Sequence, residues 1–158
     1  MSRFLELARG TSHGYYLRVR EDGETLSKKA CVINCPYSLT ISYLNAISVP
    51  PFESHGDSLP RQFLGDMDRH TVTVYFLMLQ YLKKENSFWW PYIRTLPQPD
   101  EIDKVGTPFW FSKEDRIWLL GTDLEEASLT RVAIWKKDWE RAMQMLRVLG
   151  WPVEAYTW

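Results

Sequence analysis

The side chains best suited to holding a metal ion are few and widely spaced. Only two of them, Cys31 and Cys35, stand close together. A structural zinc site takes four such ligands, so the spacing does not predict a metal site. If residues 31–35 form a strand, the two thiols face the same side, which favours two small buried residues and leaves a metal or redox role as the alternative. The three histidines, which could also bind a metal, are far apart in the sequence, at His13, His55 and His70.

The sequence contains none of the glycine-rich or nucleophile motifs of common enzyme classes. G-x-G-x-x-G, G-x-x-x-x-G-K-[ST] and G-x-S-x-G are all absent, which removes the motif support for phosphate cradles and nucleophile elbows. The carboxylate pair Glu125-Glu126 falls in the first turn of an expected helix, where it complements the positive end of the helix dipole. No catalytic residue is therefore assigned.

Aromatic residues are concentrated in two short irregular segments, residues 88–92 and 109–111. Such a cluster could line a ligand groove. The alternative, which we favour, is that the rings fix irregular backbone onto neighbouring helices, because each buries ~150 to 250 Å².

The composition indicates one ordinary globular domain in the cytoplasm or nucleus. The 158 residues are 45% hydrophobic with a formal charge of -1, so we expect no nucleic-acid partner. Charged residues interrupt the N-terminal segment 1–10, which excludes a signal-peptide core there, and the longest apolar run, residues 75–79, is too short to span a bilayer. Two cysteines do not make a disulfide framework.

The pattern along the chain predicts a helix-dominant α+β fold. Residues 13–19 and 24–35 are expected to form two strands joined by a turn at 20–23, followed by a short helix over 43–46. The prolines and glycines of residues 50–65 predict a linker or surface loop there. The expected division is 1–49 for a small antiparallel β front, 50–65 for the loop, and 66–158 for an all-helical part of about four helices.

Three of these helices can be given bounds from the sequence. One runs from Asp66 to about Asn86, with Gln80 and Lys83 on its polar face. Ser112 begins a second, which ends at Gly121, and Thr122 begins a long third that ends near Gly150. The apolar stripe expected on the third is Leu129, Val132, Trp135, Trp139, Met143, Leu146 and Leu149.

Three ordered motifs resemble one family. They are the run Ser87–Pro97 (SFWWPYIRTLP), the run Thr107–Ser112 (TPFWFS) and the run Leu119–Leu124 (LLGTDL). In this order and spacing they resemble the helical insertion of the SET-domain protein-lysine methyltransferases related to the Rubisco large-subunit methyltransferase. The front is similar too, over the segments HGYYL at 13–17, GETL at 23–26 and CPYSL at 35–39. The resemblance spans roughly residues 10–150 and implies a partial SET domain followed by its insertion.

The resemblance implies S-adenosylmethionine as cofactor and a protein lysine as substrate. By position, His13, Gly14 and Tyr15 would contact the cofactor. Tyr16 stands where the family often has glycine, and its bulk would crowd a backbone meant to approach a ligand. A weakened cofactor site is therefore expected.

The family's catalytic segment does not occur in these 158 residues. None of the asparagines, Asn34, Asn45 and Asn86, is followed by histidine, and Tyr156 precedes the expected position of the catalytic tyrosine. We therefore expect a truncated methyltransferase or a fragment that is inactive by itself. The alternative function is a non-catalytic helical module that binds a protein partner. Either function predicts exposed apolar surface, and hence self-association or contact with a missing C-terminal half.

Overall fold

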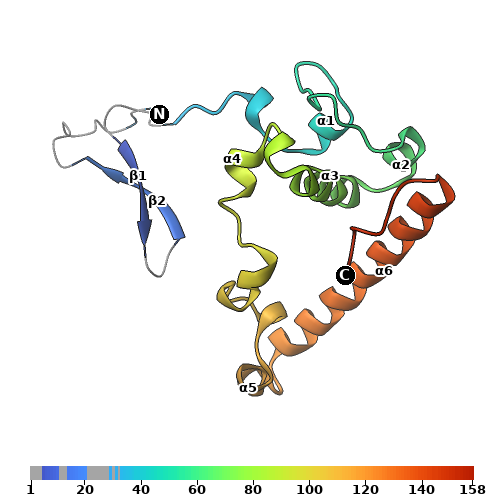
Figure 1. Cartoon of the computed structure of the whole chain (residues 1–158). Coiled ribbons are helices and arrows are strands. Elements are labelled where there is room, and N and C mark those ends of the chain that lie inside the picture. Colours follow the sequence, from blue (N-terminus) through green and yellow to red (C-terminus); the bar gives the residue numbers. More distant parts are fainter. Residues whose placement is uncertain (1–4, 11–13, 21–28, 30, 32) are drawn as a thin grey trace. The chain divides into compact units, whose positions relative to one another are not determined.

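A computed structural model of the chain describes residues 5–10, 14–20, 29, 31 and 33–158 (Figure 1). The chain divides into two compact units, Met1–Thr40 and Ile41–Trp158. The described residues are mostly helical, with one two-stranded antiparallel sheet. The expected α+β, helix-dominant class is confirmed. No helix in this described part is both long and apolar enough to cross a membrane.

The first unit contains a β-hairpin formed by β1 (Leu5–Gly10) and β2 (Gly14–Val19). Its register runs from Leu5 opposite Val19 to Gly10 opposite Gly14. An ion pair of 2.5 Å between Arg18 Nε and Glu6 Oε1 joins the strands across the sheet.

The strand predicted at 13–19 is confirmed over its described residues, 14–19. It pairs with β1, which precedes it and was not predicted. Of the second strand expected over 24–35, the described residues 29, 31 and 33–35 are not in a strand. Apolar and charged side chains alternate in β1 only over Leu5–Leu7, which is too short a run to predict a strand. The expected turn at 21–23 and residues 24–28, 30 and 32 lie outside the described residues. A short 3-10 helix, η1 (Tyr37–Leu39), follows.

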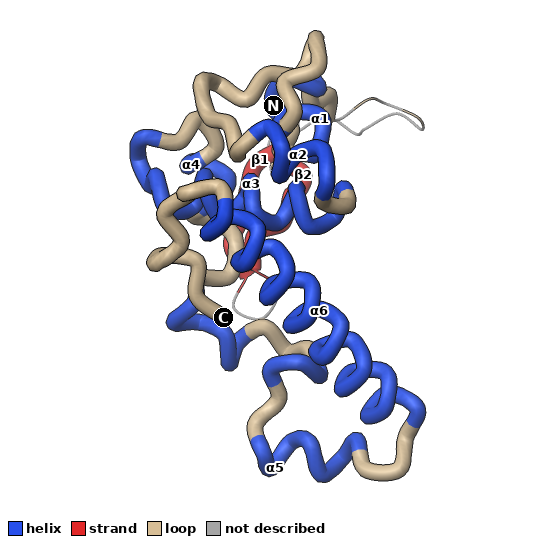
Figure 2. Tube along the Cα trace, turned by 90° about the vertical axis from the view of Figure 1, so that its right-hand side faces the viewer, coloured by secondary structure: helices blue, strands red, loops and turns tan. Residues whose placement is uncertain are grey.

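The second unit packs around α3 (Arg69–Lys83), which is flanked by α1 (Tyr43–Ala46), α4 (Trp90–Ile93) and the C-terminal half of α6 (Asp123–Val148) (Figures 1 and 2). The helix expected from 66 to 86 is confirmed as α3 followed by the 3-10 turn η2 (Lys84–Asn86). Its N-cap is Asp68, which accepts from the Thr71 backbone N–H at 3.0 Å. The core residues are Ala46, Leu59, Phe63, Met67, Val72, Tyr75, Phe76, Trp89, Ile93, Ala142, Met143, Leu146, Val153 and Tyr156.

The proline-rich segment expected as a loop packs into this core. It contains the helix α2 (Arg61–Asp66), and Leu59 and Phe63 are 1% and 0% exposed. Along the chain, the boundary between the two units follows Thr40, ten residues before the expected loop. Helix α1 therefore belongs to the helical unit. Prolines signalled a break in secondary structure, but they do not show whether the chain between helices is buried.

The predicted helix starts at Ser112 and Thr122 are confirmed. Ser112 caps α5 (Lys113–Arg116), which continues into the 3-10 turn η5 (Ile117–Leu119), and Thr122 caps α6 by accepting from the Glu125 N–H at 3.3 Å. Gly121 lies between them with φ of 74°, a conformation that glycine adopts without strain. Two further 3-10 segments, η3 (Pro99–Lys104) and η4 (Pro108–Trp110), connect α4 to α5.

The apolar stripe predicted on α6 is buried only toward its C-terminal end. Met143 and Leu146 are in the core, whereas Leu129 is 59% exposed. The correction has a simple cause: the first half of α6 extends beyond α1 to α4, toward α5 (Figures 1 and 2). Periodicity alone does not reveal where the packing neighbours end.

Candidate functional site

Two of the three residues expected to contact a cofactor, Gly14 and Tyr15, lie at the start of β2 in the first unit. Gly14 begins β2 opposite Gly10, and Tyr15 follows opposite Arg9. His13 lies outside the described residues. Gly14 and Tyr15 are therefore adjacent on one strand, as the sequence required.

The ring of Tyr16 stays on the surface of the hairpin. It lies opposite Ala8 and is 43% exposed, and the neighbouring Leu17 is 39% exposed.

The two cysteines do not form the buried pair that was favoured. Both Cys31 and Cys35 are exposed and free, and neither lies in a strand. Their thiols donate to nearby carbonyls, those of Ile33 and Pro36, at 3.4 and 3.7 Å. Within the described residues no group of three or more histidine, cysteine or acidic side chains is placed to hold a metal.

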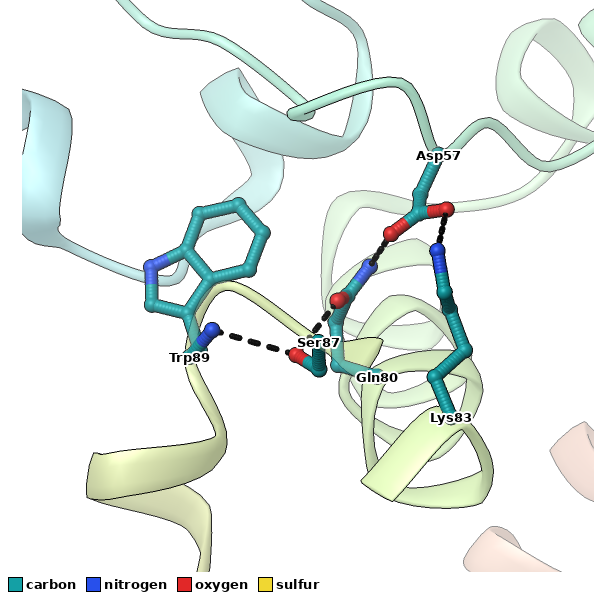
Figure 3. Close-up of polar contacts among 5 residues, drawn as sticks. All are labelled: Asp57, Gln80, Lys83, Ser87 and Trp89. Atoms are coloured by element: carbon teal, nitrogen blue, oxygen red, sulfur yellow. Dashed lines mark hydrogen bonds and ion pairs between the residues drawn. The ribbon is translucent and has the colours of Figure 1, made fainter. Parts of the chain in front are cut away.

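The first aromatic motif is fixed by a buried polar network (Figure 3). Ser87 Oγ donates to Gln80 Oε1 at 2.7 Å and accepts from the Trp89 backbone N–H at 3.1 Å. Gln80 Nε2 donates to Asp57 Oδ2 at 3.0 Å, and Lys83 forms an ion pair with the other oxygen of Asp57. One side-chain amide thus joins α3 to the segment before α2 and to the segment before α4.

Burial makes this network structural. Gln80 is 0% exposed and Ser87 is 5% exposed, and a buried amide without partners costs about 1 to 3 kcal/mol. Both ends of the Gln80 amide are satisfied. The prediction that Gln80 lies on the polar face of its helix was wrong, because α3 is covered on that side by the chain around Asp57.

The rings of the same motif continue the packing. Trp89 is 3% exposed and meets Phe76 of α3 edge to face, with centroids 5.4 Å apart. Phe88 stacks on His55 at 3.6 Å and keeps 44% of its surface exposed. In the second motif, Phe109 packs on Trp135 of α6 at 4.7 Å. For Trp89 and Phe109 the anchoring interpretation is confirmed.

Two shallow hollows lie on the surface of α6. The residues that line the first are Trp139, Met143, Arg147, Val153, Glu154, Tyr156, Thr157 and Trp158. The second is lined by Asp123, Glu126, Ala127, Thr130, Arg131 and Ile134. Neither includes a residue of the aromatic segments 88–92 or 109–111, so those segments do not line either hollow.

Two buried tyrosines lie where the C-terminal segment meets α3. The rings of Tyr75 and Tyr156 are stacked 5.6 Å apart, and the Tyr75 hydroxyl donates to the Trp139 carbonyl at 3.2 Å. Burial, aided by the neighbouring Tyr156, raises the pKa of Tyr75 to about 12, although Arg147 opposes the shift. Burial also raises the pKa of Tyr156. Both phenols are therefore neutral packing groups at physiological pH.

Comparison with known proteins gives one distant relative. The ribosomal lysine N-methyltransferase set10 of Schizosaccharomyces pombe is 27% identical to the chain over 137 residues, which cover 84% of the chain and 22% of that protein. The chain therefore spans about a fifth of the length of this relative. No family model and no solved structure matches the chain. The comparison supports a methyltransferase-like origin.

Proposed function

We propose that this chain forms the first strands and the helical insertion of an S-adenosylmethionine-dependent protein-lysine methyltransferase of the SET type, and that it does not transfer methyl groups by itself. The observation that carries the proposal is the 27% identity to a lysine methyltransferase across 84% of the chain. The motifs that suggested the family are the same segments that build the core around Trp89 and the capped start of α6.

The chemistry explains why such a part is needed and why it is insufficient. Methyl transfer from a sulfonium to an amine is an in-line displacement, so the protein supplies orientation, a water-poor channel and a route for the amine proton. The helical part would supply a rigid wall on the substrate side. The sequence has no Asn-His pair, and Tyr156 is 3% exposed and stacked on Tyr75, which is unsuitable for a channel tyrosine.

The proposed cofactor contacts are His13, Gly14 and Tyr15. Their support is positional: Gly14 and Tyr15 are consecutive at the start of β2, and a glycine lets a ligand approach the backbone closely. The exposed ring of Tyr16 predicts weak binding. A lysine side chain of a protein is the substrate that the same resemblance implies. Because the relative is a ribosomal lysine N-methyltransferase, ribosomal proteins are the first substrates to test. The proposed compartment is the cytoplasm or nucleus.

A calorimetric titration with S-adenosylmethionine tests the cofactor site. We expect saturable binding near millimolar strength, ~4 kcal/mol. Gly14→Val should abolish it, whereas Gly65→Val is the matched control, because a side chain added at Gly65 meets no atom within 4 Å. No heat at millimolar cofactor, or equal binding by both variants, would overturn the assignment of these residues.

A second candidate function is a non-catalytic module that binds another protein. It is favoured by the apolar side chains exposed around the start of α6, among them Trp118 and Leu129, which are 84% and 59% exposed. The titration separates the two candidates, since a pure binding module has no need of the cofactor.

A further inference from the structure

The segment formed by residues 113–135, here called the arm, comprises α5, η5 and the first half of α6 and extends away from the core of its unit (Figures 1 and 2). Its apolar side chains are unusually exposed: Ile117, Trp118, Leu120, Leu124, Leu129 and Ile134 are 46% to 84% exposed. Apolar residues on several sides of a helix are typical of a helix that is covered.

One face of the arm helix is self-complementary. Glu126, Leu129, Ala133 and Lys136 recur at helical spacing and therefore lie along one side of α6, and all four are exposed. Glu126 and Lys136 lie five residues on either side of position 131, and Leu129 and Ala133 lie two residues on either side of it. Arg131 itself, about 200° around the helix from Leu129, points away from this face.

We propose that two copies of the chain associate through this face, with their α6 helices antiparallel about a twofold axis at position 131. This arrangement places Leu129 of each copy opposite Ala133 of the other, so that a large side chain meets a small one and the helices approach closely. It also places Glu126 opposite Lys136, and the twofold axis produces this ion pair twice.

The wider charge distribution selects this antiparallel arrangement and a second copy as the occupant. Residues 113–126 contain two basic and five acidic side chains, whereas residues 127–148 contain five basic and two acidic ones. The two segments thus carry opposite net charges of equal size, -3 and +3. Antiparallel copies bring them together, whereas parallel copies would bring like charges together.

Sedimentation equilibrium of the full chain from low micromolar to millimolar concentration tests the proposal. We expect a reversible monomer–dimer equilibrium that weakens with added salt. Lys136→Glu should weaken association at least tenfold, about 1.4 kcal/mol. The double variant Glu126→Lys with Lys136→Glu should restore association to within about threefold of the original, roughly 0.65 kcal/mol, because the two pairs are rebuilt with their signs exchanged.

Arg131→Glu is the matched control, since it makes the same change of charge on the opposite side of the helix and should leave association within the same range. Far-UV circular dichroism of each variant shows that α6 remains folded. A chain that stays monomeric at every concentration would overturn the proposal. A dimer that tolerates Lys136→Glu, or that the double variant fails to restore, would refute this face as its interface.

Discussion

Replacing Gln80 by glutamate exchanges one nitrogen of the buried network for oxygen and should reveal how much the network contributes to stability. In the native chain the Gln80 amide donates to Asp57 Oδ2 at 3.0 Å and accepts from Ser87 Oγ at 2.7 Å. Gln80→Glu keeps the shape of the side chain and the acceptor for Ser87. In its ionised form it has no donor, and it places a second carboxyl group against Asp57, which is already paired with Lys83.

The size of the effect follows from the burial. Gln80 is 0% exposed, so solvent does not screen the introduced group, and two carboxylates at this distance do not both ionise. Holding the introduced acid neutral at pH 7, against an unfolded pKa of about 4.3, costs about 4 kcal/mol at 1.36 kcal/mol per pH unit. Since its folded pKa is raised, the penalty is present at neutral pH and disappears as the pH falls to about 4.3, where the unfolded chain is also protonated.

Urea unfolding followed by far-UV circular dichroism at pH 7 and at about pH 4.3 measures this difference against the unmodified chain at each pH. Gln144→Glu is the matched control, because Gln144 is an exposed residue of α6, and it should change stability by less than about 0.5 kcal/mol. Equal losses for Gln80→Glu at both pH values, or a loss no larger than that of the control, would refute the buried network.

Four other substitutions have definite expected outcomes in the same unfolding assay. Asp68→Ala removes the acceptor of the Thr71 N–H and should lower the stability by about 1 kcal/mol. The hydrogen bond from the Thr71 side chain lowers the pKa of Asp68. The contribution of Asp68 to stability is therefore present at neutral pH and is lost as the pH falls below 3.8. Tyr75→Phe should cost about 1 kcal/mol, and an alkaline absorbance titration should lose the phenol that ionises near pH 12. Phe76→Ala should cost ~3 to 5 kcal/mol, whereas Trp118→Ala, at an exposed ring, should change monomer stability by less than about 0.5 kcal/mol.

Local signals in the sequence were sufficient for the helix ends. Ser112 and Thr122 were expected as caps because a short hydroxyl side chain can accept from a backbone N–H three residues later, and the structure has both hydrogen bonds, at 3.1 and 3.3 Å. Gly121 and Gly150 adopt positive φ values where the helices were expected to stop. These interactions involve only neighbours along the chain, so no knowledge of the fold was required.

Features that depend on distant contacts were missed. Gln80 was placed on the polar face of its helix because its side chain is polar, yet it is buried and bonded to Asp57, which lies 23 residues earlier. The pairing of β2 with β1 was missed because the expected partner followed it in the sequence. Within the candidate site, Gly14 and Tyr15 stay a prediction that rests on the family motif. The network that fixes the aromatic motif left only a weak signal, a glutamine four residues after Phe76 on the buried side of α3.

Helix α6 shows how one sequence pattern can serve two purposes. The same stripe that buries Met143 and Leu146 against α3 continues to Leu129, where the chain supplies no neighbours to cover it. Neither periodicity nor propensity changes at the point where the core ends, because both describe the helix and not its surroundings. The charges do change: residues 113–126 are net acidic and residues 127–148 are net basic. The acidic first turn complements the dipole of its own helix, and an antiparallel copy would place the basic residues of its α6 opposite that turn, so the same distribution of charge serves both the helix and the proposed contact.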